Sequence, residues 1–252
     1  MSKGSNSITV ITVVFNAKDL IARTLKSVAN QSHPAVTHLI IDGGSTDGTL
    51  NVLSQFENLS VYSEPDKGIY DAMNKGLKRA GGDYVIFINA GDELANENVL
   101  AEMMSACDGS DVYYGDTLIV DSERRVLGKR RHSPPRTLTW KSFQMGMLVS
   151  HQSILARRSI CPEYNLQYKI SADIDWTIRL MKVAKSSCFW DKPVSLFLAG
   201  GESTQRKKLG LEERWQISVS HYGFFHTLLA HAAIVARAVY YFFTGSFRSA
   251  YK

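Results

Sequence analysis

The chain lacks the short motifs that mark several common functional classes. Its three cysteines form no CxxC pair, and neither a zinc-ligand spacing nor a helix-turn-helix pattern is present. No glycine-rich loop ends in glycine-lysine-serine/threonine, and no GxGxxG run occurs, so a P-loop and a dinucleotide-binding fingerprint are excluded. An odd number of cysteines in separate segments predicts reduced thiols and a cytoplasmic setting.

Basic runs interleaved with aromatic residues are also missing, which argues against nucleic acid as a partner. The formal charge of +5 and the pI near 9.0 fit an anionic ligand or an anionic membrane surface. The first segment, MSKGSNS, contains no apolar run. We therefore expect no signal peptide and a protein that stays on the cytoplasmic side.

Acidic residues are absent from residue 215 onward, where the chain is strongly apolar and rich in aromatic residues. His226, His231 and Arg237 interrupt the apolar run, so a membrane-spanning helix is not favoured. We expect an amphipathic, interfacial helical tail instead, with Arg237 and Arg248 towards anionic headgroups. The alternative is a helix that packs on the domain or on a second subunit of a homo-oligomer.

Strands and helices alternate in the first third of the chain. ITVITVVF at residues 8–15 is β-branched and almost continuously apolar, as expected for a strand buried on both faces of a parallel sheet. Short loops between the elements predict right-handed crossovers in a mostly parallel, doubly wound α/β sheet flanked by helices. The expected strands are residues 8–15, 38–41, 59–63 and 84–88, with helices at 17–30, 50–56 and from 69 to the glycine pair 81–82.

After residue 92, strands and helices no longer alternate regularly along the sequence. Residues 136–149 are too irregular to assign. The remaining segments predict a helix at 96–106, a short strand at 111–114, a hairpin-like pair at 117–132, a strand at 153–156 and a helix from 171.

Polar side chains follow each of the four predicted strands. Asn16, Asp42, Asp66 and Asp92 all come directly after or close to a strand end. Ligands of such sheets bind outside the carboxyl ends of the strands. The sequence therefore predicts one polar rim that collects these four residues.

The segment DGGSTDGT, residues 42–49, is a well-capped turn whose chemistry is concentrated in its first residue. The glycines allow a tight turn, and the serine, threonine and aspartate can cap the next helix. These turn and capping roles account for every residue of the segment except Asp42. A carboxylate at a strand end can accept hydrogen bonds from a base or a ribose.

The segment SEPDKGIYDAMNKGLKRAGGDYVIFINAGD, residues 63–92, combines a turn, a helix and a strand. Asp66 and Lys67 lie at the helix N-terminus, where anions are favoured. Tyr70 and Asn74 are four residues apart, so they share a helix face that could look into the cleft. Asp92 ends the strand, where a rim aspartate suits a hard divalent ion that also binds nucleotide phosphates.

These two segments together resemble the nucleotide-sugar-binding half of glycosyltransferase family 2, which has a GT-A fold. Later segments, SHQ at 150–152, YKISADIDWTIRL at 168–180 and GGEST at 200–204, resemble bacterial members that build exopolysaccharides such as colanic acid. The resemblance implies a GT-A α/β fold that binds a nucleotide-diphosphate sugar. We expect a donor half at 1–95, an acceptor and catalytic half at 96–210, and a helical tail at 211–252.

The resemblance also implies roles for individual residues. Asp42 would contact the base or ribose, and Asp66 would line the same pocket, with Asn16, Lys67, Tyr70 and Asn74 as further donor-binding candidates. Asp92 would be the carboxylate that holds a divalent metal, Mn²⁺ or Mg²⁺, although Asn89 and Gly91 stand where many relatives carry aspartates.

Catalysis falls on a second set of residues by the same resemblance. Asp173 would be the catalytic base, and Asp175 is the fallback candidate. His151 and Gln152 would border the acceptor or diphosphate side of the cleft, and Ser203 would belong to a loop over the donor.

The combined expectation is a metal-dependent, inverting glycosyltransferase on the inner face of the cell membrane. Its acceptor would be a glycan, plausibly carried on a polyprenyl diphosphate. Two alternatives stay open: a sugar-phosphate nucleotidyltransferase, and a non-catalytic, membrane-tethered module that binds nucleotide sugars. The first would carry a glycine-rich, basic loop after residue 15, which this chain lacks.

Overall fold

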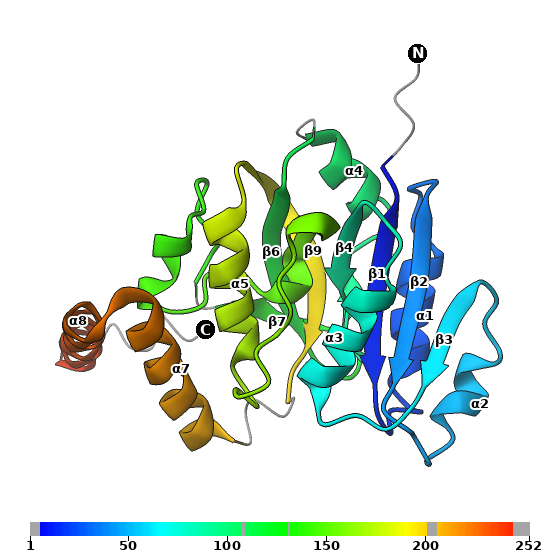
Figure 1. The fold of residues 1–252 in the computed structure, drawn as a ribbon, viewed down its shortest axis with the longest axis horizontal. Coiled ribbons are helices and arrows are strands. Elements are labelled where there is room, and N and C mark those ends of the chain that lie inside the picture. Colours follow the sequence, from blue (N-terminus) through cyan, green and yellow to red (C-terminus); the bar gives the residue numbers. More distant parts are fainter. Residues whose placement is uncertain (1–5, 107–108, 131, 201–205, 244–252) are drawn as a thin grey trace.

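A single twisted sheet forms the centre of the molecule (Figure 1), in a computed structural model that describes residues 6–106, 109–130, 132–200 and 206–243. The sheet has nine strands, eight of them in the order β3-β2-β1-β4-β8-β6-β9-β5, with β7 paired to β6. The first four strands along this order follow the expected doubly wound pattern. The α/β fold class is therefore confirmed.

The N-terminal half of the sheet is parallel. β1 pairs with β2 on one side and β4 on the other, and β3 adds to the far edge of β2. All residues of β1 and β4 are buried, as their continuous apolar sequences predicted. These strands are β1 (Ile8–Val14), β2 (Val36–Asp42), β3 (Leu59–Ser63) and β4 (Tyr84–Phe87).

The other half of the sheet mixes strand directions. β8 runs antiparallel between β4 and β6, while β9 runs parallel to β6. The strand expected at 111–114 and the first arm of the expected hairpin form one long strand, β6, because backbone pairing continues through the polar residue Asp116. The strands are β5 (Glu93–Leu94), β6 (Val112–Val120), β7 (Val126–Lys129), β8 (Ile154–Arg157) and β9 (Ser187–Leu198).

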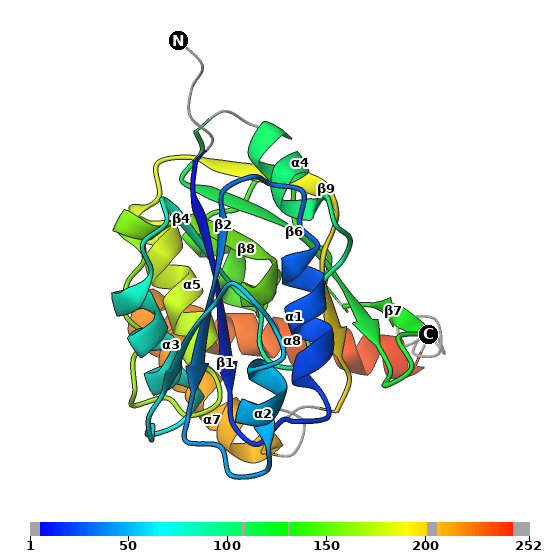
Figure 2. The ribbon, with the colours of Figure 1, turned by 90° about the vertical axis from the view of Figure 1, so that its right-hand side faces the viewer.

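Helices cover both faces of the sheet (Figure 2). One apolar cluster packs α3 and α5 against one face, with Met73 and Trp176 as fully or nearly fully buried members. Val28 of α1 and Leu100 of α4 belong to a second cluster on the opposite face. The helices are α1 (Ile21–Ala29), α2 (Thr49–Leu53), α3 (Ile69–Arg79), α4 (Val99–Ala106) and α5 (Ala172–Val183), with short 3₁₀ helices at Trp140–Met145, His151–Ser153 and Arg158–Ile160.

Gly76 explains how closely α3 approaches the sheet. A Cβ atom at this position would lie 2.5 Å from Cγ2 of Ile11 on β1. Only glycine therefore allows this separation between helix and strand. The contact fixes the distance between the sheet and α3, the helix that carries the candidate residues Tyr70 and Asn74.

The last third of the chain ends in two helices beside α5 (Figure 1), α7 (Lys207–Tyr222) and α8 (Phe224–Phe243). Gly223, with a φ of 84°, makes the turn between them. The ring of Trp215 on α7 packs edge-on against Phe224 and His231. Within the residues that the structure describes, no helix combines the length and apolar character needed to cross a membrane.

The cysteines differ from the expectation of reduced thiols. Cys161 is free and half-buried, but Cys188, which is buried on β9, is disulfide-bonded. The sequence pattern missed this bond because the spacing of isolated cysteines carries no information on which segments lie close together in the fold. Thiol state therefore gives no support to a cytoplasmic setting.

A buried histidine couples the fold to pH. His38 lies on β2, and its Nε2 atom is 2.9 Å from Oγ1 of Thr12 on β1. Burial lowers the pKa of His38 from 6.5 to about 3. The imidazole is therefore neutral in the folded protein at neutral and mildly acidic pH.

We predict that this histidine makes the fold less stable in mild acid. The unfolded chain binds a proton at His38 near pH 6.5, whereas the folded chain binds it only near pH 3. The free energy of unfolding is therefore greatest above pH 6.5. It decreases as the pH falls, by about 2 kcal/mol between pH 6.5 and 5. Urea unfolding at pH 7.5 and 5.0 should show a smaller loss in His38→Asn than in the parent; equal losses would contradict the prediction.

Candidate functional site

The donor side of the candidate site lies at the carboxyl ends of β1, β2 and β3, at the lower edge of the sheet in Figure 1. The parallel register places Val14 beside Asp42 and Asp42 beside Ser63, so the three strands end at the same level. The polar residues that follow these strands are therefore brought together, as the sequence predicted.

Asn16 organises the loop that follows β2. It has a left-handed backbone with a φ of 48°. Its backbone N–H donates to Oγ of Ser45 at 2.8 Å, and its Oδ1 accepts from the N–H of Thr46 at 2.9 Å. The contacts of Asn16 thus fix the shape of the donor loop.

Asp42 is completely buried at the end of β2. Its Oδ2 accepts three hydrogen bonds, from the N–H groups of Gly44 and Ser45 at 3.1 and 3.0 Å and from Oγ of Ser63 at 2.6 Å. Its Oδ1 has no hydrogen-bond partner among the described residues. One oxygen therefore shapes the loop, and the other retains its capacity to accept a bond from a ligand hydroxyl or base.

Asp66 approaches the same loop from β3. Its Oδ1 accepts from the N–H of Gly68 at 2.8 Å. A Cβ atom on Gly43 would lie 2.4 Å from Asp66 Oδ2, so the carboxylate occupies the space that this glycine leaves. Lys67 is exposed next to it, and the site thus offers one anion and one cation at the start of α3.

Phe15 is a candidate that the sequence analysis missed. Its ring is 61% exposed at the end of β1. Cδ2 of the ring would lie 3.4 Å from the same Cβ position on Gly43. An exposed aromatic face beside Asp42 and Asp66 can stack on a planar base.

Tyr70 and Asn74 connect the donor side to the second half of the chain. The Tyr70 hydroxyl donates to the carbonyl of Ile170 at 2.8 Å and lies 3.3 Å from Oδ1 of Asp173. Asn74 donates to the carbonyl of Tyr164 at 2.9 Å and accepts from its N–H at 2.6 Å. The two side chains share a face, but buried protein partners occupy it, which differs from the expected contact with the nucleotide.

Asp92 is buried beneath the rim. Its Oδ1 accepts from the N–H of Leu198 and its Oδ2 from Nε2 of Gln152, both at 3.0 Å. Burial raises the pKa of Asp92 to about 6, and these two bonds together with His151 oppose the increase.

A divalent ion fits this region only if the donor supplies most of its ligands. The described part of the chain contains no group of three or more His, Cys, Asp or Glu side chains arranged to hold a metal. Asp92 is one carboxylate, and the buried Oδ1 of Asn89 has no partner among the described residues. Carboxylate and amide oxygens are suitable ligands for Mg²⁺ or Mn²⁺ when phosphate oxygens complete the coordination.

Asp173 lies in the first turn of α5 with its side chain 24% exposed. Nδ1 of His151 is 3.6 Å from its Oδ2. Burial would raise the pKa of Asp173, but the nearby His151, Arg130 and Arg214 outweigh it and the pKa is lowered. The carboxylate is therefore ionised at neutral pH and accessible enough to accept a proton.

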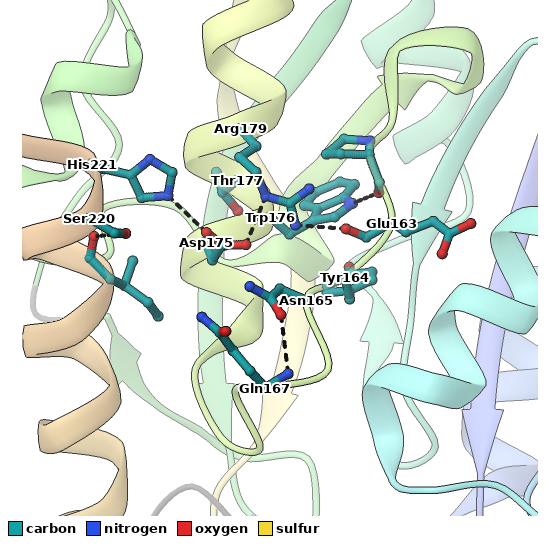
Figure 3. Close-up of polar contacts among 12 residues, drawn as sticks. Glu163, Tyr164, Asn165, Gln167, Asp175, Trp176, Thr177, Arg179, Ser220 and His221 are labelled. Atoms are coloured by element: carbon teal, nitrogen blue, oxygen red, sulfur yellow. Dashed lines mark hydrogen bonds and ion pairs between the residues drawn. The ribbon is translucent and has the colours of Figure 1, made fainter.

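Asp175 lies two positions after Asp173 on α5, but the environment of its carboxylate is different (Figure 3). Its carboxylate accepts from Nε of Arg179 and lies within hydrogen-bond distance of Nε2 of His221, each at 2.8 Å. The side chain is 6% exposed. Both oxygens of Asp175 are thus paired, with Arg179 on α5 and with His221 on α7, whereas Asp173 is the more exposed of the two carboxylates.

The adjacent residues His151 and Gln152 connect the two candidate carboxylates, Asp173 and Asp92. His151 faces Asp173, while Gln152 binds Asp92 and accepts a hydrogen bond from Oγ of Ser150. Nε2 of His151 is buried and has no hydrogen-bond partner among the described residues. Ser203, the remaining candidate, lies outside the described residues.

Comparison with solved structures defines the class of protein. The fold matches a crystal structure of Staphylococcus aureus TarS with a TM-score of 0.68 and 19% identity, covering 85% of this chain and 64% of that one. It also matches a mannosyltransferase from Pyrobaculum calidifontis in complex with GDP-Man and Mn²⁺, with a TM-score of 0.66 and 16% identity, covering 99% and 82%. The fold is that of the GT-A glycosyltransferases.

The sequence comparisons assign the family. The profile described as Glycosyl transferase family 2 matches residues 9–164, and the chain belongs to this family. It is 33% identical over 186 residues to an uncharacterised glycosyltransferase of Mycobacterium tuberculosis, covering 71% of this chain and 70% of that protein. It is also 43% identical over 157 residues to the putative teichuronic acid biosynthesis glycosyltransferase TuaG of Bacillus subtilis, covering 60% and 62%.

We predict that the close contact between Gly43 and Asp66 determines nucleotide affinity. Gly43→Ala places a methyl group where Asp66 Oδ2 now lies, so the carboxylate must move. Affinity for UDP or GDP should fall about five- to tenfold, the equivalent of one lost hydrogen bond, with little change in melting temperature. Isothermal titration calorimetry measures the first quantity.

Gly81→Ala is the matched control for this experiment. No atom lies within 4 Å of a Cβ at Gly81, so this variant should bind nucleotide as the parent does. If Gly43→Ala binds UDP or GDP with the parental affinity, Asp66 does not take part in nucleotide binding.

Proposed function

We propose that this protein is an inverting, metal-dependent glycosyltransferase that moves a sugar from a nucleoside-diphosphate sugar to a lipid-linked glycan. The observation that carries the proposal is Asp173, an ionised and partly accessible carboxylate that faces His151 and Tyr70. The similarity to TuaG, a putative teichuronic acid biosynthesis glycosyltransferase, supports a place in cell-surface polysaccharide synthesis.

The donor nucleotide is held at the rim of β1, β2 and β3. Phe15 stacks on the base, and the unpartnered oxygen of Asp42 accepts a bond from the base or the ribose. Asp66 lines the same pocket, Lys67 supplies a positive charge towards the diphosphate, and Asn16 keeps the loop in shape. UDP, UDP-GlcNAc and GDP-Man complexes of fold neighbours support this class of donor.

Asp92, with Asn89, would hold a divalent ion against the donor diphosphate. The ion supplies positive charge that stabilises the leaving nucleoside diphosphate. Gln152 and the Leu198 N–H fix the orientation of the Asp92 carboxylate.

Asp173 removes the proton from the acceptor hydroxyl as its oxygen attacks the anomeric carbon. The new C–O bond forms on the face opposite the diphosphate, and the bond from the anomeric carbon to the diphosphate oxygen breaks, so the configuration inverts. The proton ends on Asp173. His151 and Tyr70 hold the carboxylate in position throughout.

The acceptor side faces the apolar helices at the end of the chain. Exposed apolar side chains on α8 include Phe225, at 77%, and Leu229, at 71%. A cavity of about 460 Å³ between α7 and α8 is lined by Leu211, Glu212, Trp215, Gln216 and His231. These features support binding to the inner face of the membrane, where a polyprenyl-diphosphate acceptor is anchored.

We predict that Asp173→Asn abolishes transfer without abolishing donor binding. Loss of a positioned base lowers turnover by about 10²- to 10⁴-fold. The measurement is release of nucleoside diphosphate across a panel of UDP- and GDP-sugars, with Mn²⁺ or Mg²⁺ titrated. Asp191→Asn, at an exposed aspartate within β9, is the control and should retain full activity.

Near-normal turnover by Asp173→Asn would refute the assignment of the base. If the parent protein binds nucleotide sugars but produces no nucleoside diphosphate from any of them, it is a binding module and not an enzyme.

We predict that the exposed face of α8 binds anionic membranes. Phe225→Glu with Leu229→Glu places two charges on that face, and binding to phosphatidylglycerol vesicles should weaken at least about tenfold in a sedimentation assay. Val126→Glu with Leu127→Glu on β7 is the control, since both side chains are 58% exposed there. Unchanged partitioning with an altered oligomeric mass would assign α8 to a second subunit.

A further inference from the structure

Glu213 on α7 is the last acidic residue of the sequence, and it is only 4% exposed. Its carboxylate accepts hydrogen bonds from three successive backbone N–H groups. The Lys169 N–H donates to Oε1 at 2.6 Å, and the N–H groups of Ile170 and Ser171 donate to Oε2 at 2.9 and 2.8 Å. All three hydrogen bonds of the Glu213 carboxylate come from one backbone segment, residues 169–171. The buried carboxylate therefore fixes the path of that segment.

The segment leads directly into the turn that carries Asp173. Ser171 is the N-cap residue of α5, but its hydroxyl makes no capping bond to the helix and donates instead to the carbonyl of Gly210 on α7, at 3.3 Å. The approach to α5 is therefore held by α7 rather than by a local cap.

The same segment is held from the opposite side by α3. The Tyr70 hydroxyl donates to the carbonyl of Ile170 and also lies close to Asp173. Ile170 thus donates its N–H to Glu213 and accepts at its carbonyl from Tyr70. Two helices that are distant in sequence thus hold the backbone of one residue, three positions before Asp173.

We propose that Glu213 is a positioning residue for the catalytic step, acting through the backbone of residues 169–171 on the orientation of Asp173. The inference rests on the proposed function, in which Asp173 is the base. Removal of the carboxylate leaves three successive backbone N–H groups without their charged acceptor, and the first turn of α5 shifts relative to His151 and Tyr70. A displacement of about 1 Å at a reacting group costs on the order of 10²-fold in rate.

The inference predicts a loss confined to turnover. Glu213 contacts the segment before Asp173 and none of the donor residues Asp42, Asp66 or Asp92. Glu213→Gln should therefore lower kcat by about 10- to 100-fold, with unchanged KM for the donor sugar and unchanged affinity for UDP or GDP. Glu213→Asp keeps the charge on a shorter side chain and should recover part of the lost kcat.

Glu57→Gln is the control for the amide substitution, because Glu57 is an exposed glutamate between α2 and β3, away from α5 and α7 in the sequence. It should leave kcat and KM unchanged. Near-ultraviolet circular dichroism and thermal melting establish that each variant is folded.

A double-mutant cycle tests whether Glu213 acts through Asp173. In an Asp173→Asn background, Glu213→Gln should cause no further loss of the residual rate, since the group it positions is already gone. A further loss as large as in the parent would overturn the inference, as would parental kcat in a folded Glu213→Gln variant or a matching fall in nucleotide affinity. Failure of both Glu213 variants to fold would also overturn it, since the residue would then serve folding.

The inference and the proposed function fail differently. An active Asp173→Asn variant contradicts the assignment of the base and therefore the proposed function. An inactive Asp173→Asn variant beside a normal Glu213→Gln variant contradicts only the positioning role.

Discussion

The pairing between Gln152 and Asp92 is the interaction on which the rest of the candidate site depends. It ties the end of the parallel half of the sheet to the 3₁₀ turn that precedes β8, and the neighbouring His151 then faces Asp173. Two consecutive residues thus link Asp92, next to the parallel half of the sheet, to Asp173 on α5. A buried amide satisfies one oxygen of a buried carboxylate, so replacing either group alone would leave one buried atom of the other, Oδ2 of Asp92 or Nε2 of Gln152, without this partner.

The two carboxylates have the same chemistry but opposite electrostatic surroundings. Burial dominates at Asp92 and raises its pKa, whereas His151, Arg130 and Arg214 overcome burial at Asp173 and lower its pKa. Environments that move the pKa values of two similar groups apart are a common basis for giving them separate roles. The residue order along the chain contains no trace of this difference, because the cations come from distant segments.

The sequence was most informative where a strand is buried on both faces or where a motif lies within one loop. β1 to β4 and the rim of Asn16, Asp42 and Asp66 could be predicted for that reason. β9 could not, because Asp191, Lys192 and Pro193 interrupt its apolar pattern at the point where its pairing with β6 shifts register. Helical spacing placed Tyr70 and Asn74 on one face, but it could not show that Tyr164 and Ile170 cover that face.

The strand order also has a consequence for synthesis of the chain. β8 lies between β4 and β6 in the sheet, although it follows both in sequence. A nascent chain that has formed the parallel half must wait for residues 154–157 before the free edge of β4 is paired, roughly several seconds at ribosomal rates. During that interval the exposed edge is a template for pairing with another chain. Chaperone binding to the nascent chain would therefore be needed most between the emergence of the donor half and the emergence of β8.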